Sequence, residues 1–266
     1  MLRTRVLTGV ALAIVVLFSV FGLDNRMASL VFGLFWLVGT DEWARLARFS
    51  WFGRIACVAG FVLIVAVELV SGLPAAAVTA WLWAAALIWI VTFVLVLRYP
   101  VRVPNLVVAA AGLIVLPAAW LSFHNLHAVA GNGPGLVLSG LFIVWSADIG
   151  AYFTGRSIGR TALSPRVSPK KTWEGVAGGV TLAMITGLAA AALFDLPYGL
   201  MAPVAAVMAL ISVVGDLGVS MLKRNAGLKD TGVLLPGHGG VMDRFDGVTA
   251  ALPFFVSGLQ FAHVLD

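Results

Sequence analysis

Charged side chains are scarce in this sequence. Asp, Glu, Lys and Arg make up only 11% of its 266 residues, whereas hydrophobic residues make up 61%. Mean hydropathy is +1.03, which lies far above the range of soluble globular domains. The chain is too apolar to hide its side chains in one water-soluble core, and its composition is typical of a membrane protein with several spanning helices.

Cysteine is almost absent too. The single cysteine, Cys57, lies in an apolar run, which excludes a disulfide within the chain and leaves the redox compartment open. Lys and Arg (17) outnumber Asp and Glu (12), giving a formal net charge of +5. In a membrane protein this excess usually reflects cytoplasmic loops and anionic lipid. We therefore expect membrane lipid, and no nucleic acid, as a partner.

Apolar runs of about 17–25 residues predict the spanning helices. The first run follows two arginines, but it lacks a small-x-small cleavage site and further runs follow it, which favours a retained helix over a signal peptide. The second run is short and could extend through Trp43 to Leu46. The nine predicted helices are 6–23, 27–40, 52–71, 75–97, 104–122, 135–153, 174–194, 199–221 and 247–264.

Basic residues define the predicted orientation. With a cytoplasmic N-terminus, sixteen of the 17 Lys and Arg residues lie in inner segments and only Arg26 lies outside. The sequence therefore predicts an all-α polytopic membrane protein of about nine transmembrane helices, with the C-terminus outside. We expect one integral-membrane unit, in which residues 1–133 form a scaffold with a lipid groove or dimer contacts. Residues 134–266 would carry two cytoplasmic catalytic loops.

Two polar features outside these loops are interpreted as structural. Glu68 lies near the outer end of its predicted helix, so we expect its side chain to extend to the membrane interface. His124 and His127 fall in the longest predicted outer loop, 122–134. Two histidines without a carboxylate or cysteine rarely complete a metal shell, so no metal site is expected there.

The first polar cluster covers the end of the sixth run and the loop after it. Asp148 lies several residues inside an apolar run, and an intramembrane carboxylate is a functional-site candidate by default. Two Ser-Pro steps keep the loop backbone extended or turned, so that its basic side chains form a compact cluster. Basic residues are also common in the cytoplasmic loops of membrane proteins, which is the alternative explanation for this cluster. Glu174 opens the seventh helix, where either the helix dipole or a metal accounts for it. The phosphate-binding candidates here are Arg166, Ser168, Lys170 and Lys171.

The second cluster, residues 216–246, concentrates charge between glycines. Asp216, Ser220 and Lys223 recur at i, i+4 and i+7, which places them on one helix face. Asp243 and Asp246 are three residues apart and would also share a face. Glycines between residues 232 and 240 would let backbone N–H groups approach an anion closely. The catalytic candidates are Asp216, Lys223, Arg224, Lys229, Asp230, His238, Asp243 and Asp246.

The two clusters together predict chemistry on phosphates. Asp216, Asp243 and Asp246 would provide an oxygen-rich shell that binds or organises Mg²⁺, and Asp148 and Glu174 are further candidates for the metal. Cations beside such a shell can hold substrate phosphates. The phosphate-binding candidates of the second cluster are Lys223, Arg224 and Lys229.

The motifs in these two clusters resemble those of a known protein family. The stretch from Ser220 to Asp246 follows S-x-L-K-R-x4-K-D-x-G-x2-L-P-x-H-G-G-V-x-D-R-F-D, and upstream lie S-A-D at 146–148 and S-P-x-x-S-P-K-K-T-x-E-G at 164–175. These motifs are similar to those of the phosphatidate cytidylyltransferases, also called CDP-diacylglycerol synthases. No position departs from the family pattern. The resemblance covers residues 146–246 and rests on about fifteen fixed positions in its second motif.

The resemblance implies a membrane enzyme, active as a homodimer, that makes CDP-diacylglycerol and pyrophosphate from CTP and phosphatidic acid with Mg²⁺ and a second cation such as K⁺. In a bacterium it would lie in the inner membrane with its active site facing the cytoplasm. His238 would order the glycine loop or contact the nucleotide, and a role as general base is the weaker alternative. Two other functions stay open: a CTP-dependent transferase acting on another lipid phosphate, such as a polyprenyl phosphate, and an ion-coupled membrane transporter.

Overall fold

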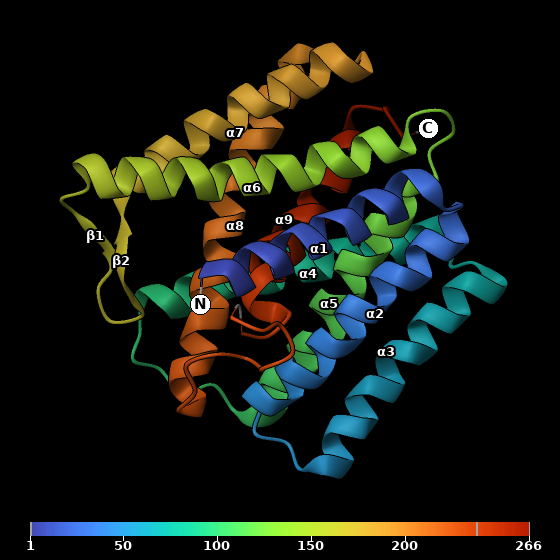
Figure 1. The fold of residues 1–266 in the computed structure, drawn as a ribbon. Coiled ribbons are helices and arrows are strands. Elements are labelled where there is room, and N and C mark those ends of the chain that lie inside the picture. Colours follow the sequence, from blue (N-terminus) through green and yellow to red (C-terminus); the bar gives the residue numbers. More distant parts are fainter. Residues whose placement is uncertain (1, 238, 266) are drawn as a thin grey trace.

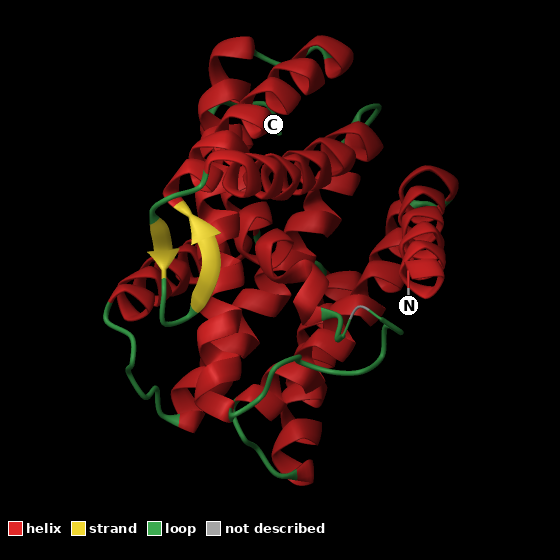
Figure 2. Ribbon diagram, turned by 60° about the vertical axis from the view of Figure 1, so that its left-hand side comes forward, coloured by secondary structure: helices red, strands yellow, loops and turns green. Residues whose placement is uncertain are grey.

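The computed structural model describes residues 2–237 and 239–265. Within these ranges the chain forms nine helices and one short β-hairpin. The elements are α1 (Leu2–Gly22), α2 (Asn25–Leu46), α3 (Trp51–Ser71), α4 (Ala75–Leu97), α5 (Asn105–His127), α6 (Gly133–Ile158), β1 (Ala162–Ser164), β2 (Ser168–Thr172), α7 (Trp173–Phe194), α8 (Tyr198–Ala226) and α9 (Met242–Phe261). Figure 1 shows their arrangement and Figure 2 their secondary structure.

Each predicted helix is present, so the all-α class is confirmed for the described residues. Six helices, α3 to α8, are long and apolar enough to cross a bilayer. Large apolar side chains such as Phe52, Trp83 and Leu193 are mostly exposed on the outside of these helices. Such an apolar surface suits lipid far better than water, and the chain is an integral membrane protein. Helices α2 and α9 contain more polar residues, and in α1 the apolar stretch Leu7–Gly22 is shorter, so nine crossings stay a prediction.

The connections between helices gather at two opposite ends of the molecule. In Figure 1 the first turns of α1, the hairpin β1–β2 and the loop segments 227–237 and 239–241 lie toward the lower left, together with the links 47–50 and 98–104. The C-terminal end and the links that precede α2, α4, α6 and α8 lie toward the upper right. The basic residues expected on the inner side are therefore concentrated at the end that carries the hairpin and the glycine loop.

Local signals in the sequence explain several helix ends. The Asp24 carboxylate accepts hydrogen bonds from the N–H groups of Arg26 and Met27 at 2.9 and 3.0 Å, which caps the start of α2. Thr172 caps α7 in the same way through the Gly175 N–H at 3.1 Å. Gly227 adopts a left-handed conformation (φ 73°) and ends α8. The site loops therefore begin and end at defined positions.

Helices α6 and α7 form a tightly packed hairpin joined by β1 and β2. A Cβ atom on Gly179 would lie 2.7 Å from the Ala147 carbonyl oxygen, and one on Gly175 would lie 2.9 Å from that of Ala151. The Gly-x-x-x-Gly pair at 175 and 179 therefore permits close helix packing. The strands are antiparallel, with Ala162 opposite Thr172.

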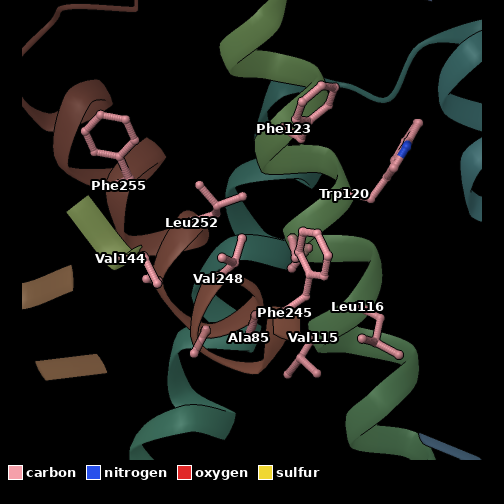
Figure 3. Close-up of a cluster of buried hydrophobic side chains, with 14 of the residues drawn as sticks. Ala85, Val115, Leu116, Trp120, Phe123, Val144, Phe245, Val248, Leu252 and Phe255 are labelled. Carbon is pink, nitrogen blue, oxygen red and sulfur yellow. The ribbon is translucent and has the colours of Figure 1, made fainter. Parts of the chain in front are cut away.

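The buried core lies where α5 and α9 meet. Figure 3 shows Trp120 and Phe123 of α5 in one cluster with Phe245, Val248, Leu252 and Phe255 of α9. Their burial is complete or nearly so, and α2 joins them through a stacked Phe32–Phe123 pair with ring centroids 3.8 Å apart. The start of α9, which carries two of the predicted site carboxylates, is thus fixed to the core.

Two expectations about the opposite end are wrong. Helix α5 continues to His127, so His124 and His127 are helical and do not lie in a loop. The Glu68 side chain does not extend to the interface, because it is only 9% exposed and turns inward. One of its oxygens accepts the Leu73 N–H at 2.7 Å, and the other lies 3.6 Å from His124 Nε2. Burial against a polar neighbour outweighs solvation at the membrane surface.

Candidate active site

Three carboxylates from three helices meet at one cavity. Asp148 of α6, Asp216 of α8 and Asp246 of α9 line a cavity of about 600 Å³, which we call the carboxylate cavity. Helices α8 and α9 approach closely here, because a Cβ on Gly215 would lie only 2.5 Å from the Asp246 carbonyl oxygen. The small residue before Asp216 therefore brings the carboxylates of the two helices together.

The hairpin adds lysines to this group. Lys171 of β2 forms an ion pair with Asp216, with Nζ and Oδ2 2.5 Å apart. Beside it lies a second cavity of about 670 Å³, the hairpin cavity, which Asp148 and Asp216 also line. Ser168 and Lys170 face this second cavity as well. The two carboxylates therefore stand between two spaces, each large enough for part of a substrate.

Asp243 holds the glycine loop to the end of α8. One of its oxygens lies 2.6 Å from Lys223 Nζ. The other accepts the N–H groups of Thr231 and Gly240 at 2.8 and 3.0 Å, and the Thr231 hydroxyl at 3.1 Å. Burial alone would raise the pKa of the Asp243 carboxyl, but the hydrogen bonds from Lys223, Gly240 and Thr231 outweigh it and lower that pKa. Both oxygens of Asp243 already have donors, so in this structure it organises the site.

Glu42 is a site residue that sequence reasoning missed. It lies near the end of α2, is 2% exposed, and its oxygens accept the backbone N–H groups of Val241 and Met242 at 3.0 and 2.9 Å. The Thr231 hydroxyl donates to it at 2.7 Å. Glu42 therefore caps the start of α9 from another helix, where a carboxylate also complements the helix dipole.

The loop glycines approach carboxylates of the protein itself. The nearest atoms to a Cβ built on Gly232 all belong to Glu42, and a Cβ on Gly240 would strike Glu42 and Thr231. One on Gly239 would lie 2.7 Å from an Asp243 oxygen. Among these glycines, Gly240 donates its N–H to the Asp243 carboxylate, and the approach of a substrate anion to the loop stays a prediction.

The remaining predicted residues fall into three groups. Asp230 and Lys223 line the carboxylate cavity with the three carboxylates, and Ser220 donates to Asp216 at 3.2 Å, as expected for residues on one helix face. Glu174 accepts the N–H groups of Arg160 and Thr161 at 3.2 Å and so joins the hairpin to α7. Three candidates lie elsewhere: Arg166 donates to the Tyr99 carbonyl, Arg224 lines a different cavity, and Lys229 is exposed. His238 lies outside the described residues.

The donor chemistry of the carboxylate cavity suits a hard divalent cation. Asp246 lies close enough to Asp216 and Asp148 for mutual electrostatic repulsion, and Lys171 opposes it. Among the described residues, no three His, Cys, Asp or Glu side chains already form a coordination shell. An ion held here would complete its shell with water and substrate oxygens, which is the usual arrangement for Mg²⁺. The three carboxylates therefore fit Mg²⁺ as partial ligands.

Fold and site together define a class of protein: a helical integral-membrane protein whose clustered carboxylates and lysines can hold phosphate groups. The chain belongs to the cytidylyltransferase family, whose sequence model matches residues 3–262, and it is a nucleotidyltransferase. It is 40% identical to a phosphatidate cytidylyltransferase of Pseudomonas aeruginosa, over 97% of this chain and 96% of the relative. A protein of that name from Haemophilus influenzae is 33% identical, over 96% and 97% of the two chains. One from Brucella suis is 44% identical over 58% of this chain and 57% of its own length.

Proposed function

We propose that this chain is a phosphatidate cytidylyltransferase, which transfers CMP from CTP to phosphatidic acid and forms CDP-diacylglycerol and pyrophosphate. The observation that carries the proposal is the group of Asp148, Asp216 and Asp246 with Lys171, placed between two cavities. Membership of the cytidylyltransferase family and the shared name of its relatives support the same reaction.

The reaction asks mainly for positioning and charge neutralisation. The phosphate of phosphatidic acid is already anionic at neutral pH, so one of its oxygens can attack the α-phosphorus of CTP with little help from a base. The bond to the β-phosphate then breaks and pyrophosphate leaves. Lys171 and Lys223 would hold phosphate oxygens and reduce the repulsion between the two substrates. Their present carboxylate partners, Asp216 and Asp243, keep both lysines in place.

Asp148, Asp216 and Asp246 are the residues that would hold Mg²⁺, and Asp243 would keep Lys223 and the loop in order. When bound, Mg²⁺ supplies charge neutralisation at the phosphate oxygens. A second cation such as K⁺ is part of the same proposal.

The excess of basic residues at the hairpin end supports a cytoplasmic active site in a bacterial inner membrane, where CTP is available. The family resemblance supports a homodimer, which the mass of the detergent-solubilised protein would test.

The α1 wall of the carboxylate cavity is the proposed approach for lipid. Leu12, Ala13 and Val16 of α1 line it opposite the polar residues, and α1 also contacts the glycine loop through Thr8, which donates to the Pro236 carbonyl at 3.2 Å. An apolar wall beside phosphate-binding groups suits acyl chains.

We expect Ala13→Trp to raise KM for phosphatidic acid about fivefold and to leave KM for CTP unchanged, because the indole would fill the apolar side of the cavity. Steady-state assays with each substrate varied in turn measure both constants. Ala11→Trp is the matched control, since Ala11 is also exposed on α1 but does not line the cavity. Equal effects of the two variants would place the lipid elsewhere.

The reaction itself is tested with labelled CTP and the purified chain in detergent. We expect label in a lipid product with phosphatidic acid, equimolar release of pyrophosphate, loss of both with EDTA and recovery with Mg²⁺. A polyprenyl phosphate offered in competition distinguishes the alternative transferase. If neither lipid is labelled while reconstituted vesicles accumulate an ion, the transporter alternative is correct.

A further inference from the structure

A third cavity, separate from the carboxylate and hairpin cavities, is lined by arginines. It has a volume of about 430 Å³ and lies between the α2–α3 link, the α4–α5 link and the end of α8. Arg48, Arg102 and Arg224 contribute to its lining, one from each of these segments, and no Asp or Glu does. We propose that this arginine cavity is a second anion-binding site that takes a phosphate group.

The arginines of this cavity differ from their neighbours in their partners. Arg45 and Arg54 flank the same α2–α3 link, and both are neutralised by Asp41 at 2.5 and 2.6 Å. Within the described part of the chain, Arg48, Arg102 and Arg224 form no ion pair with a carboxylate. The positive-inside rule accounts for basic residues in cytoplasmic loops, but it does not require three of them to line one cavity that has no Asp or Glu in its lining.

Backbone groups add to the positive potential. Helix α5 begins at Asn105, which lines the cavity, and its first turn has no side-chain cap. The free N–H groups and the helix dipole at this end favour an anion. The walls are also tied together: Arg48 donates to the Asn225 carbonyl, and the Asn225 amide donates to the Val101 carbonyl at 2.9 Å. The cavity is therefore preformed, which limits the entropy lost on binding.

Three guanidinium groups and a helix N-terminus match a phosphate in charge and shape, because each guanidinium can donate two parallel hydrogen bonds to phosphate oxygens. The phosphate could belong to the headgroup of an anionic phospholipid or be free in solution. Arg224 follows Lys223 directly on α8, so adjacent residues of one helix face two different cavities. A ligand here would bind independently of the carboxylate cavity.

Hydrogen–deuterium exchange of the full chain in detergent locates such binding. One arm adds dioctanoyl phosphatidylglycerol, a second adds inorganic phosphate, and dioctanoylglycerol, which lacks phosphate, is the lipid control. We expect slower exchange in peptides covering 98–106 and 222–228, and about a tenfold higher half-maximal ligand concentration for Arg102→Gln. Arg98→Gln, in the same link but outside the cavity lining, should bind as the wild type does.

The arms separate the two sources of phosphate. Protection by phosphatidylglycerol alone identifies a lipid headgroup, and protection by both probes identifies any accessible phosphate. The proposal is overturned if neither probe protects these peptides, or if Arg98→Gln weakens binding as much as Arg102→Gln, since that would be general charge attraction. Arg48→Gln is the second cavity variant, and its unfolding temperature shows whether loss of the bond to Asn225 affects folding.

Discussion

Asp246→Asn is expected to reduce turnover by about 10³-fold or more without lowering the unfolding temperature. Asparagine has the same size and keeps an oxygen for the Gly247 N–H, which Asp246 now accepts at 2.8 Å. It removes a carboxyl group whose ionised form is disfavoured by burial and by Asp216 and Asp148. A site that holds like charges together for function is less stable than its neutral variant, so stability should stay constant or increase.

The measurement pairs steady-state turnover with thermal unfolding of the same preparation. Asp195→Asn is the matched control: Asp195 directly follows α7 and lines neither the carboxylate cavity nor the hairpin cavity, and its left-handed conformation (φ 53°) suits asparagine. Normal turnover of Asp246→Asn would show that this carboxylate has no part in the reaction. A lower unfolding temperature would show that its charge supports the fold instead.

Much of the fold could be predicted from the sequence because apolar runs and charge asymmetry are local signals. They located all nine described helices, and the extension of α2 to Leu46 was an explicit alternative. The shared face of Asp216, Ser220 and Lys223 follows from helix periodicity, and it is present. The end of α5 was missed because His124 and His127 are polar yet partly or wholly buried, which composition alone does not reveal.

The sequence indicated which residues are candidates for the site, but not which of them contact one another. Lys223 and Arg224 were both predicted to bind substrate phosphates, although neighbouring positions on a helix point about 100° apart and the two residues line different cavities. Glu42 had a visible signal, since it is an acid at the end of an apolar run. However, Arg45 stands four residues after Asp41 and three after Glu42, and either pair would stabilise a helix. Only the contact between α2 and the start of α9 distinguishes the two acids.

Glu42→Ala is expected to destabilise the protein by about 3–5 kcal/mol and to abolish most activity, because it leaves buried donors without an acceptor. The N–H groups of Val241 and Met242 would lose this acceptor, and the Thr231 hydroxyl would keep only its longer contact with Asp243. Asp41→Asn is the matched control on the neighbouring residue, whose ion pairs are partly exposed and contribute little. Equal unfolding temperatures for the two variants would contradict the role of Glu42.

A double-mutant cycle then distinguishes a precise contact from general loss of stability. Gly232→Ala is expected to be destabilising, because the three atoms nearest to the added methyl group would all belong to Glu42, the carboxyl carbon at 3.0 Å among them. Once Glu42 is replaced by alanine, that obstruction is gone and the methyl group has room. The effects of the two substitutions on unfolding free energy should therefore sum to more than the effect of the double variant. Additive effects would mean that the contact between Gly232 and Glu42 does not stabilise the loop. The start of α9 would then be fixed by Asp243 and the core alone.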